Sequence, residues 1–391
     1  MAVTTPPAAV AAPAASLAPP DPAVEAKPER LVSLDALRGF DMIWILGGEE
    51  VIHSLAKTFP NPVTQFLSYE FDHAAWAGFR VYDLIFPLFV FIVGVSIVFS
   101  LGRLIETRGR AAAVKRVVVR ALVLYLLGLI YYGGLATTFG HIRPMGVLQR
   151  IALAYLFAGL AFIYLRPGAL ALVAAALLVG YWALLSFVPA PGETHATFAE
   201  GHNWPNWFDR QYLPGRKWDG DHDPEGVLST FPAVAGCLLG VFAGLLLRKP
   251  LVPPLKKVGV LMLAGAAGVI AGYVWGLQFP IIKKLWTSSF VLLTAGYGSI
   301  LLAVFYLVID VWRWRRWCTP FVWVGMNAIT LYLAVQLVDF KALASRLVGG
   351  EGSDLHAHLH GLGDLLVSVV FVALVLLLAR FLYKKQIFLR V

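Results

Sequence analysis

Long apolar stretches recur along this chain and limit what it can fold into. A helix that crosses a bilayer needs about 20 mostly apolar residues, and ten segments meet that requirement. They are residues 36–55, 82–102, 117–134, 145–165, 169–188, 227–247, 258–278, 287–310, 319–340 and 363–383. Only 14% of the 391 residues are charged, whereas soluble domains carry about 25%. The sequence therefore predicts an all-α, polytopic membrane helix bundle of about ten transmembrane helices.

The distribution of Lys and Arg predicts the orientation of this bundle, because cytoplasmic loops carry an excess of both. If the N-terminus is cytoplasmic and the segments alternate, 21 of the 32 Lys and Arg residues lie inside and 11 lie outside. We therefore expect both termini to be cytoplasmic. The same bias accounts for the net charge of +9 without a nucleic-acid partner.

Two regions differ in composition from the apolar segments. Residues 1–30 are rich in Ala and Pro and lack a basic stretch followed by an apolar core, so we expect a disordered cytoplasmic tail and no signal peptide. The membrane domain is then 31–391. Residues 189–226, rich in Trp, Gly, Pro and Asp, fall on the outer side and are expected to form an ordered loop over a site. Cys237 and Cys318 are expected to be reduced.

Polar side chains at the ends of the apolar segments are the candidates for function, because ionisable groups in membrane helices are costly. His73 is followed ten residues later by Asp83, which opens an apolar segment and needs a cationic or imidazole partner. Each polar group also has a structural alternative: Lys283 and Lys284 as interfacial residues, Asn327 as an interhelical hydrogen-bond donor. Spacing alone does not decide between these alternatives.

Other patterns point to packing or exclude familiar chemistry. Gly236, Gly240 and Gly244 recur every four residues, which favours close helix packing. The alternating histidines of DLHAHLHG, His356, His358 and His360, have no cysteine nearby, so we expect no metal site. The sequence contains no Walker A, GxSxG or HExxH motif.

Several motifs in a fixed order make the chain similar to the transmembrane acyltransferases typified by heparan-α-glucosaminide N-acetyltransferase. The resemblance covers roughly residues 30 to 391. Its carriers are RLVSLDALRGF, HAAWAGFRVYDLIFPLFVFIVGVSI, IRPMGVLQR, HDPEGVLSTF, LWTSSFVLLT, PFVWVGMNAITLYL and YKKQIFLRV. It implies a membrane-embedded acetyltransferase that moves an acetyl group from cytosolic acetyl-CoA to a glucosamine-type sugar on the extracytoplasmic face. It also implies a homodimer, and we expect a bacterial plasma (inner) membrane.

The resemblance assigns roles to individual residues. The family's active-site histidine heads an H-A-x-W motif, here His73, which would act as a base or carry the acetyl group. Asp83 or Asp72 would orient its ring, and Glu49 would bind the acceptor. The CoA phosphates would be bound by basic residues on the cytosolic side: Arg38, Arg103, Arg116 and Arg120. The substrate-binding candidates are Glu50, Arg143, Arg150, Glu225, Lys284, Trp286 and Asn327.

The sequence departs from the family pattern at three places. Glu49 stands where the lysosomal enzyme has an asparagine, and Val335 stands where that enzyme has a further histidine. We also find no counterpart of the luminal domain that precedes the helices in that enzyme. The acceptor therefore stays open between a glucosamine-type sugar, a cell-wall fragment and another hydroxylated glycan.

Two other classes of function fit the same residues. A proton-coupled transporter or flippase of a glycan or small metabolite could use the polar cluster as a proton relay. A non-catalytic scaffold or sensor would tolerate the loss of every outer charge. The family resemblance favours the enzyme.

Overall fold

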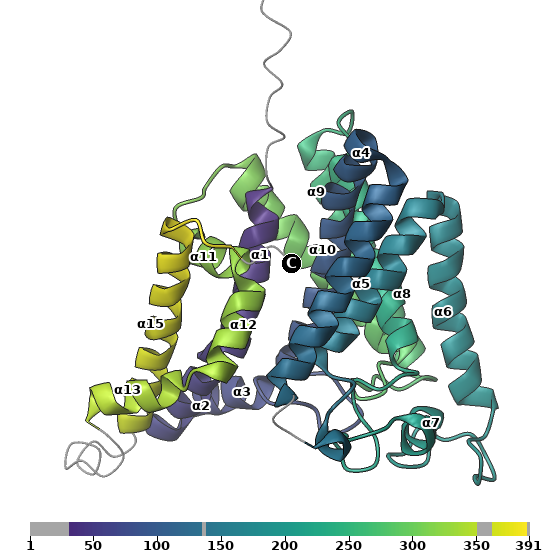
Figure 1. The fold of residues 1–391 in the computed structure, drawn as a ribbon, viewed down its shortest axis with the longest axis horizontal. Helices are drawn as coiled ribbons and strands as arrows, with labels where there is room; N and C mark the ends of the chain where they lie inside the picture. The colour runs from purple at the N-terminus through teal and green to yellow at the C-terminus, as the bar shows by residue number, and fades with distance from the viewer. Residues whose placement is uncertain (1–30, 135–137, 350–361, 389–391) are drawn as a thin grey trace, which may run out of the picture. The chain divides into compact units, whose positions relative to one another are not determined.

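The protein is described here by a computed structural model that covers residues 31–134, 138–349 and 362–388. Within these ranges the chain is helical and has no strand, as expected (Figure 1). The α-helices are α1 (Val32–Ile43), α2 (Glu49–Thr58), α3 (Pro62–Glu70), α4 (Ile85–Tyr131), α5 (Val147–Tyr164), α6 (Pro167–Phe187), α7 (Trp204–Tyr212), α8 (Thr230–Arg248), α9 (Pro254–Gly276), α10 (Ser288–Phe305), α11 (Thr319–Met326), α12 (Ala328–Leu337), α13 (Phe340–Val348) and α15 (Leu362–Lys384). The tail at 1–30 and the three alternating histidines lie outside the described residues.

The helices make this a multi-pass membrane protein. In the described part of the chain, seven helices are long and apolar enough to cross a bilayer. An eighth span results if α11 and α12, which meet at an angle of 75°, are counted together. The predicted number of ten was approximate for two reasons. The predicted segments 82–102 and 117–134 fall in one helical run, and the segment 36–55 is broken into shorter helices.

Helix α4 contains both of those predicted segments because it folds back on itself at Gly109. This glycine has a φ of +79°, outside the helical region. A methyl group placed on Gly159 of α5 would lie 3.1 Å from Val117 and 3.6 Å from Leu101. These two residues would be about 24 Å apart along one straight helix. The run of 47 residues is therefore a hairpin of two membrane-length segments.

The first predicted segment, 36–55, is not one continuous helix. Helix α1 continues into a π-helical turn at Trp44–Gly48 and then into α2. Gly47 adopts a φ of +110° inside this turn, which a side chain would disfavour. The break places Glu49 and Glu50 in the first turn of α2.

Small residues bring the central helices together, as the glycine spacing predicts. A side chain on Gly240 of α8 would collide with the Phe91 carbonyl of α4, and one on Gly94 with the Cys237 carbonyl. Only glycine permits this close approach of the two backbones. Cys237 and Cys318 are both free and buried.

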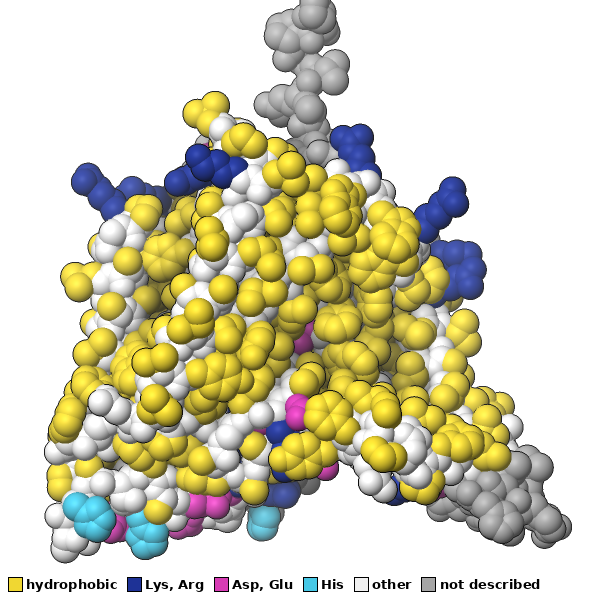
Figure 2. Space-filling view, turned by 180° about the vertical axis from the view of Figure 1, so that it is seen from behind, with side chains coloured by type: hydrophobic (Ala, Val, Ile, Leu, Met, Phe, Trp, Pro, Cys, Tyr) yellow, Lys and Arg dark blue, Asp and Glu magenta, His cyan; other side chains and the backbone are white. Residues whose placement is uncertain are grey.

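Charged side chains are unequally distributed between the two ends of the folded unit that begins at Val32. Figure 2 shows Lys and Arg side chains projecting at the upper end and His and acidic side chains gathered at the lower end. The lower end carries α2, α3, α13 and the loop 189–226, which includes α7 (Figure 1). This loop is ordered, as expected, and its polar residues form part of the candidate site.

Candidate active site

The structure brings His73 and Asp83 into contact. His73 lies in the loop after α3, and Asp83 belongs to a 3₁₀ turn, Val81–Leu84, that precedes α4. Asp83 Oδ2 accepts hydrogen bonds from the backbone N–H groups of Arg80 (3.1 Å) and Ala74 (3.2 Å), while Oδ1 lies 2.8 Å from His73 Nδ1. The Asp83 side chain is fully buried and that of His73 is 51% exposed. A buried acid thus holds one nitrogen of an accessible imidazole.

Lys283, from the loop between α9 and α10, completes this group. Its Nζ lies 2.9 Å from His73 Nδ1, 3.1 Å from His73 Nε2 and 3.4 Å from Asp83 Oδ1. Burial lowers the pKa of Lys283, and the charge of Asp83 opposes that change. When Nδ1–H donates its hydrogen bond to the Asp83 carboxylate, Nε2 carries the lone pair that can accept a proton or attack a carbonyl.

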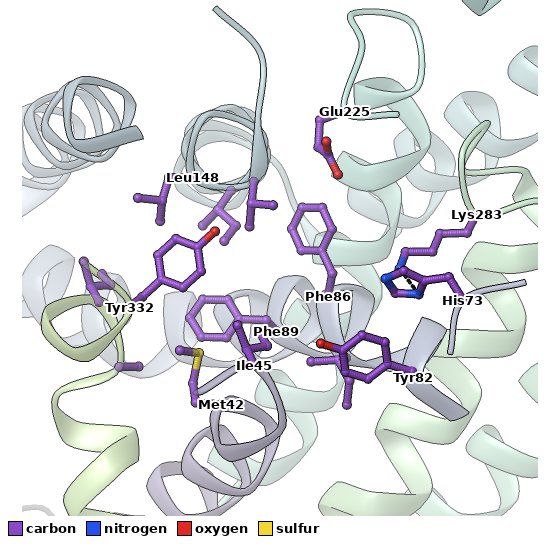
Figure 3. A pocket seen from close by; sticks show the side chains of 15 residues that line it. Met42, Ile45, His73, Tyr82, Phe86, Phe89, Leu148, Glu225, Lys283 and Tyr332 are labelled. Carbon is purple, nitrogen blue, oxygen red and sulfur yellow. Dashed lines mark hydrogen bonds between the residues drawn. The ribbon is translucent and has the colours of Figure 1, made fainter. Parts of the chain in front are cut away.

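A largely apolar cavity of about 200 Å³ opens beside His73; we call it the central cavity. Figure 3 shows His73 and Lys283 at one end of it and Leu148 and Tyr332 at the other. The remaining polar lining residues are Tyr82, whose ring lies 4.8 Å from that of His73, and Glu225. The cavity can therefore hold a small apolar group within reach of a base and a cation.

Two further cavities share walls with the central cavity. The loop-side cavity, of about 680 Å³, shares four lining residues with it: His73, Val147, Glu225 and Lys283. The arginine cavity, of about 180 Å³, contains Arg38, Arg120 and Asn327 and shares five: Phe89, Leu148, Ile151, Ala328 and Ile329. His73 thus lies on a line of adjoining cavities that extends from the arginines of α1 and α4 to the loop 189–226.

Arg143 cross-links the loop in front of α8. Its guanidinium donates hydrogen bonds to both carboxylate oxygens of Asp223, at 2.8 and 2.7 Å, and to Glu225 at 2.5 Å. The Tyr132 and Trp218 rings lie 4.5 and 4.9 Å from it. Burial raises the pKa of Glu225. With its donors engaged by two carboxylates, Arg143 shapes the loop-side cavity and has little capacity left for a substrate anion.

Arg150 and Trp286 pack against the same loop from the helical side. Arg150 is fully buried and donates hydrogen bonds to the Pro224 carbonyl (2.9 Å) and to the Ser229 hydroxyl. Its guanidinium also lies 4.6 Å from the Trp286 ring. Trp286 lines the loop-side cavity, whereas Arg150 lines none of the three cavities. Arg150 therefore contacts the loop backbone and lies outside these three cavities.

Asp209 of α7 fastens the same loop, although the sequence analysis did not select it. Its carboxylate accepts hydrogen bonds from the backbone N–H groups of Val227 (3.1 Å) and Asp223 (3.3 Å). A side chain on Gly226 would collide with it. Burial raises the pKa of Asp209 to about 6, from an ordinary value of 3.8.

Replacing Asp209 with Asn is expected to reduce the pH dependence of stability. The folded state binds the Asp209 proton more tightly than the unfolded state, so this stabilisation is full below about pH 4 and is lost as the pH rises through about 6. The loss is on the order of 3 kcal/mol. Thermal unfolding at pH 4.5 and 7 should show a larger fall in the melting temperature for the wild type than for Asp209→Asn. Equal falls would contradict this account of Asp209.

Three of the predicted acidic residues lie apart from the imidazole. Asp72 is 60% exposed and lies 3.8 Å from His53, so it does not orient His73. Glu50 pairs with Lys341 at 2.9 Å and lines a separate cavity of about 720 Å³. Glu49 lies near Tyr82, which lines the central cavity, and does not line that cavity itself.

Some of the predicted basic residues line a cavity and others do not. Arg38 and Arg120 line the arginine cavity, whereas Arg103 and Arg116 are exposed and line none of the three cavities. Lys284 lines the loop-side cavity and pairs with two carboxylates of the loop 189–226.

Asn327, a predicted substrate-binding residue, lies between α11 and α12 and lines the arginine cavity. It is 2% exposed, and its amide donates a hydrogen bond to the Trp323 carbonyl at 3.3 Å.

Three polar residues of the central cavity, Lys283, Tyr82 and Tyr332, were not among the predicted site residues. The doublet of lysines in IIKKLW was recognised, but only Lys284 was selected. Tyr82 and Tyr332 lie in apolar helical stretches, where a single hydroxyl gives no signal of its own.

Comparison with known proteins agrees with the motifs. A family profile described as heparan-α-glucosaminide N-acetyltransferase, catalytic, matches residues 30–265. The chain is 26% identical to human heparan-α-glucosaminide N-acetyltransferase over 93% of its own length and 60% of the relative's. It is 27% identical to the mouse protein of that name over 81% of its own length and 56% of the relative's. The chain thus spans less than two thirds of the length of these relatives.

Proposed function

This chain belongs to the heparan-α-glucosaminide N-acetyltransferase family, and from that premise we propose that it is a membrane-embedded acetyltransferase. It moves an acetyl group from acetyl-CoA to an amine or hydroxyl of a glucosamine-type sugar. The observation that carries the proposal is the place of His73: the ring is held by a buried Asp83 and lies where two cavities share a wall. A donor and an acceptor can reach the same nitrogen from those two cavities.

The proposed chemistry uses His73 Nε2. As the acceptor attacks the thioester carbonyl carbon, Nε2 takes its proton; a C–N or C–O bond forms, the C–S bond breaks, and the proton passes to the departing CoA thiolate. In the two-step alternative Nε2 itself attacks the carbonyl carbon and CoA leaves as the thiolate. The acceptor then attacks the acetyl group, the N–C bond to the imidazole breaks, and the acceptor's proton passes to the thiolate. In both paths Asp83 stabilises the charged ring, and Lys283 lies beside the oxyanion that develops on the carbonyl.

The arginine cavity is the proposed entry for acetyl-CoA. Its phosphates need positive charge, and Arg38 and Arg120 are the two arginines that line this cavity. Arg120 lies 4.9 Å from the Tyr155 ring, and Arg38 donates a hydrogen bond to Ser96 at 2.8 Å. With both termini in the cytoplasm of a bacterium, this end would face the cytosol, and the acceptor would enter from the extracytoplasmic side.

Replacing Arg120 with Ala is expected to weaken donor binding. A hydrogen bond to a charged group contributes about 1.5–3 kcal/mol, so the KM for acetyl-CoA should rise by about 10- to 100-fold with a smaller change in kcat. Initial rates at varied acetyl-CoA would measure this. Arg110→Ala is the matched control, because Arg110 is exposed and lines none of the cavities. An unchanged KM in Arg120→Ala would remove this cavity from the donor path.

The loop-side cavity is the proposed acceptor site. It combines the aromatic rings of Trp218 and Trp286 with the carboxylates of Asp219 and Glu225. An amino sugar offers an ammonium group that both kinds of side chain attract. Glu225 is the only carboxylate among the described lining residues that the central and loop-side cavities share, so we assign it to the acceptor. The family resemblance further suggests a homodimer.

A transfer assay tests the proposal. Purified protein receives labelled acetyl-CoA and a panel of amino sugars and cell-wall fragments, and the labelled product is identified. Product that depends on both substrates supports the enzyme. Because adjoining cavities would also suit a proton-coupled transporter or flippase, sealed vesicles are assayed in parallel without CoA. Sugar accumulation there, with no acetylated product in the transfer assay, would favour transport.

A further inference from the structure

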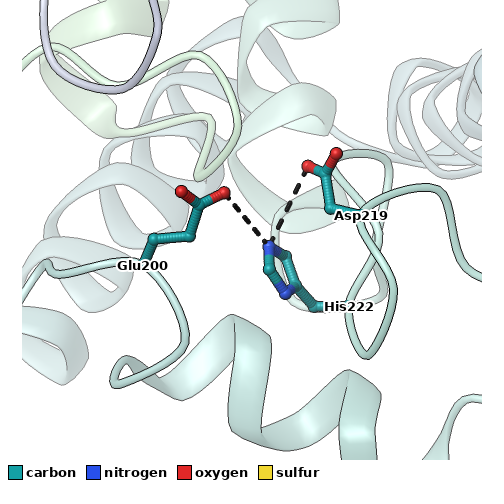
Figure 4. A group of neighbouring side chains, drawn as sticks. All are labelled: Glu200, Asp219 and His222. Atoms are coloured by element: carbon teal, nitrogen blue, oxygen red, sulfur yellow. Dashed lines mark ion pairs between the residues drawn. The ribbon is translucent and has the colours of Figure 1, made fainter.

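Three side chains of the loop 189–226 converge outside the central cavity. Figure 4 shows Glu200 and Asp219 on either side of His222, with both carboxylates directed at one ring nitrogen. The ligand atoms of the three residues all lie within 4.8 Å of one another. His222 Nε2 is 3.6 Å from Glu200 Oε1 and 3.9 Å from Asp219 Oδ2. These separations suit oxygen and nitrogen atoms that share a cation.

The state of His222 points to such a cation. The residue is 5% exposed, and its Nε2 makes no hydrogen bond with any described residue. Its Nδ1 lies 2.7 Å from Asp221 Oδ1. When Nδ1–H donates to Asp221, the Nε2 lone pair faces two carboxylates. A buried lone pair opposite two negative charges is unfavourable unless a positive charge lies between them.

The donor set matches a transition metal. One imidazole nitrogen and two carboxylate oxygens are the ligand types of zinc sites that keep a fourth position open. A carboxylate on the remote ring nitrogen, as Asp221 provides, is the usual support of a metal-binding histidine. Asp221 is itself held by Arg210, at 2.7 Å. The ring is thus oriented before any ion arrives.

A lysine ammonium competes for the same position. Lys284 Nζ lies 3.0 Å from Glu200 Oε1 and 3.0 Å from Asp219 Oδ2. Its side chain is 31% exposed, and the Trp76 ring lies 5.9 Å from the ammonium. A flexible four-carbon stem allows the ammonium to leave the carboxylates. Lys284 also lines the loop-side cavity, so it has a place to move to.

We propose that Glu200, Asp219 and His222 form a binding site for a divalent transition-metal ion of the Zn²⁺ class, which exchanges with the ammonium of Lys284. The bound ion joins the segment before α7 to the turn at residues 219–222. It thereby fastens the loop over the loop-side cavity and releases Lys284 toward the acceptor. The site is separate from the chemistry at His73, so metal binding does not depend on whether the protein transfers acetyl groups.

Titration of the purified, metal-free full chain with Co²⁺ tests the site, followed by visible absorption and by displacement with Zn²⁺. We expect one Co²⁺ ion per chain at this site, displaced by Zn²⁺ and not by Ca²⁺, which prefers six to eight oxygen ligands. Glu200→Gln and His222→Ala should abolish the absorption band. Glu200 is 45% exposed, so its variant keeps the test valid if His222→Ala does not fold. Stoichiometric binding that persists in Glu200→Gln, or no saturable binding by the wild type, would overturn the proposal.

Three more variants separate the parts of the proposal. Asp221→Asn should weaken Co²⁺ binding by about 10- to 100-fold. Lys284→Met should strengthen it, because the competing ammonium is gone; an unchanged affinity would refute the exchange. His202→Ala is the matched control, since His202 lies in the same loop, pairs with Glu193 at 2.8 Å and is 63% exposed. Loss of binding in the control would mean that the ion is held elsewhere in the loop.

Discussion

Replacing His73 with Ala is expected to lower the rate of acetyl transfer by about 10²- to 10⁴-fold, the contribution of a positioned general base or acid. Acetyl-CoA binding should be nearly unchanged, because the proposed phosphate contacts lie in the arginine cavity. The variant removes the nitrogen that we propose to face both substrates and leaves the buried Asp83 with its two backbone donors. Turnover with saturating acceptor and a separate acetyl-CoA binding titration measure the two effects.

A second histidine provides the control for this variant. His141 is exposed, hydrogen-bonds Thr138 and lines none of the three cavities beside or near His73. His141→Ala should therefore retain wild-type turnover. If His73→Ala also retains it, the imidazole has no part in the reaction. Label that remains on the wild-type protein, but not on His73→Ala, when acceptor is withheld would select the acetyl-imidazole path.

Replacing Lys283 with Met is expected to lower kcat by about 10²- to 10³-fold, which is the usual effect of removing one donor to a developing oxyanion. The KM values should change less, because a Met side chain fills a similar volume. Lys341→Met is the control, since Lys341 is 61% exposed and pairs with Glu50 in a separate cavity. A kcat for Lys283→Met within a few-fold of the wild type would contradict the role of this ammonium.

The pH profile gives an independent readout for Lys283. Burial lowers the pKa of this ammonium, so the wild-type rate should decline at a lower alkaline pH than an exposed lysine would give. Arg stays protonated at any such pH. Lys283→Arg should therefore keep part of the activity and lose that alkaline decline. If Lys283 had only a structural role, the rate of Lys283→Arg would depend on pH in the same way as the wild-type rate.

The sequence predicted the helices and part of the site, each for a physical reason. Stretches of about 20 apolar residues predict buried or membrane-spanning helices, and most of the predicted segments coincide with long apolar helices of the structure. The two arms of the hairpin in α4 were predicted as the separate segments 82–102 and 117–134, whereas the break after α1 escaped notice because it depends on one glycine, Gly47. The contact of His73 with Asp83 was predictable because a carboxylate at the head of an apolar helix needs a partner close by in the chain.

The remaining contacts of the site join residues that are far apart in the chain or depend on the packing of the helices, so the sequence pattern did not predict them. Lys283 stands 210 positions from His73 and reaches it only through the packing of the loop before α10. Asp72, beside His73 in the chain, turns instead to His53. Arg103 and Arg116 carry the same charge as Arg120, and only the fold distinguishes the arginine that lines a cavity from those that face outward.

Transfer across a sealed membrane tests the central claim most directly. Protein in proteoliposomes, in one known orientation, receives labelled acetyl-CoA on the side of the arginine cavity and an impermeant amino sugar on the side of the loop 189–226. We predict that labelled acetyl sugar appears in the sugar compartment and that His73→Ala forms none. Acetylation that requires both substrates on the same side would contradict the line of cavities through His73.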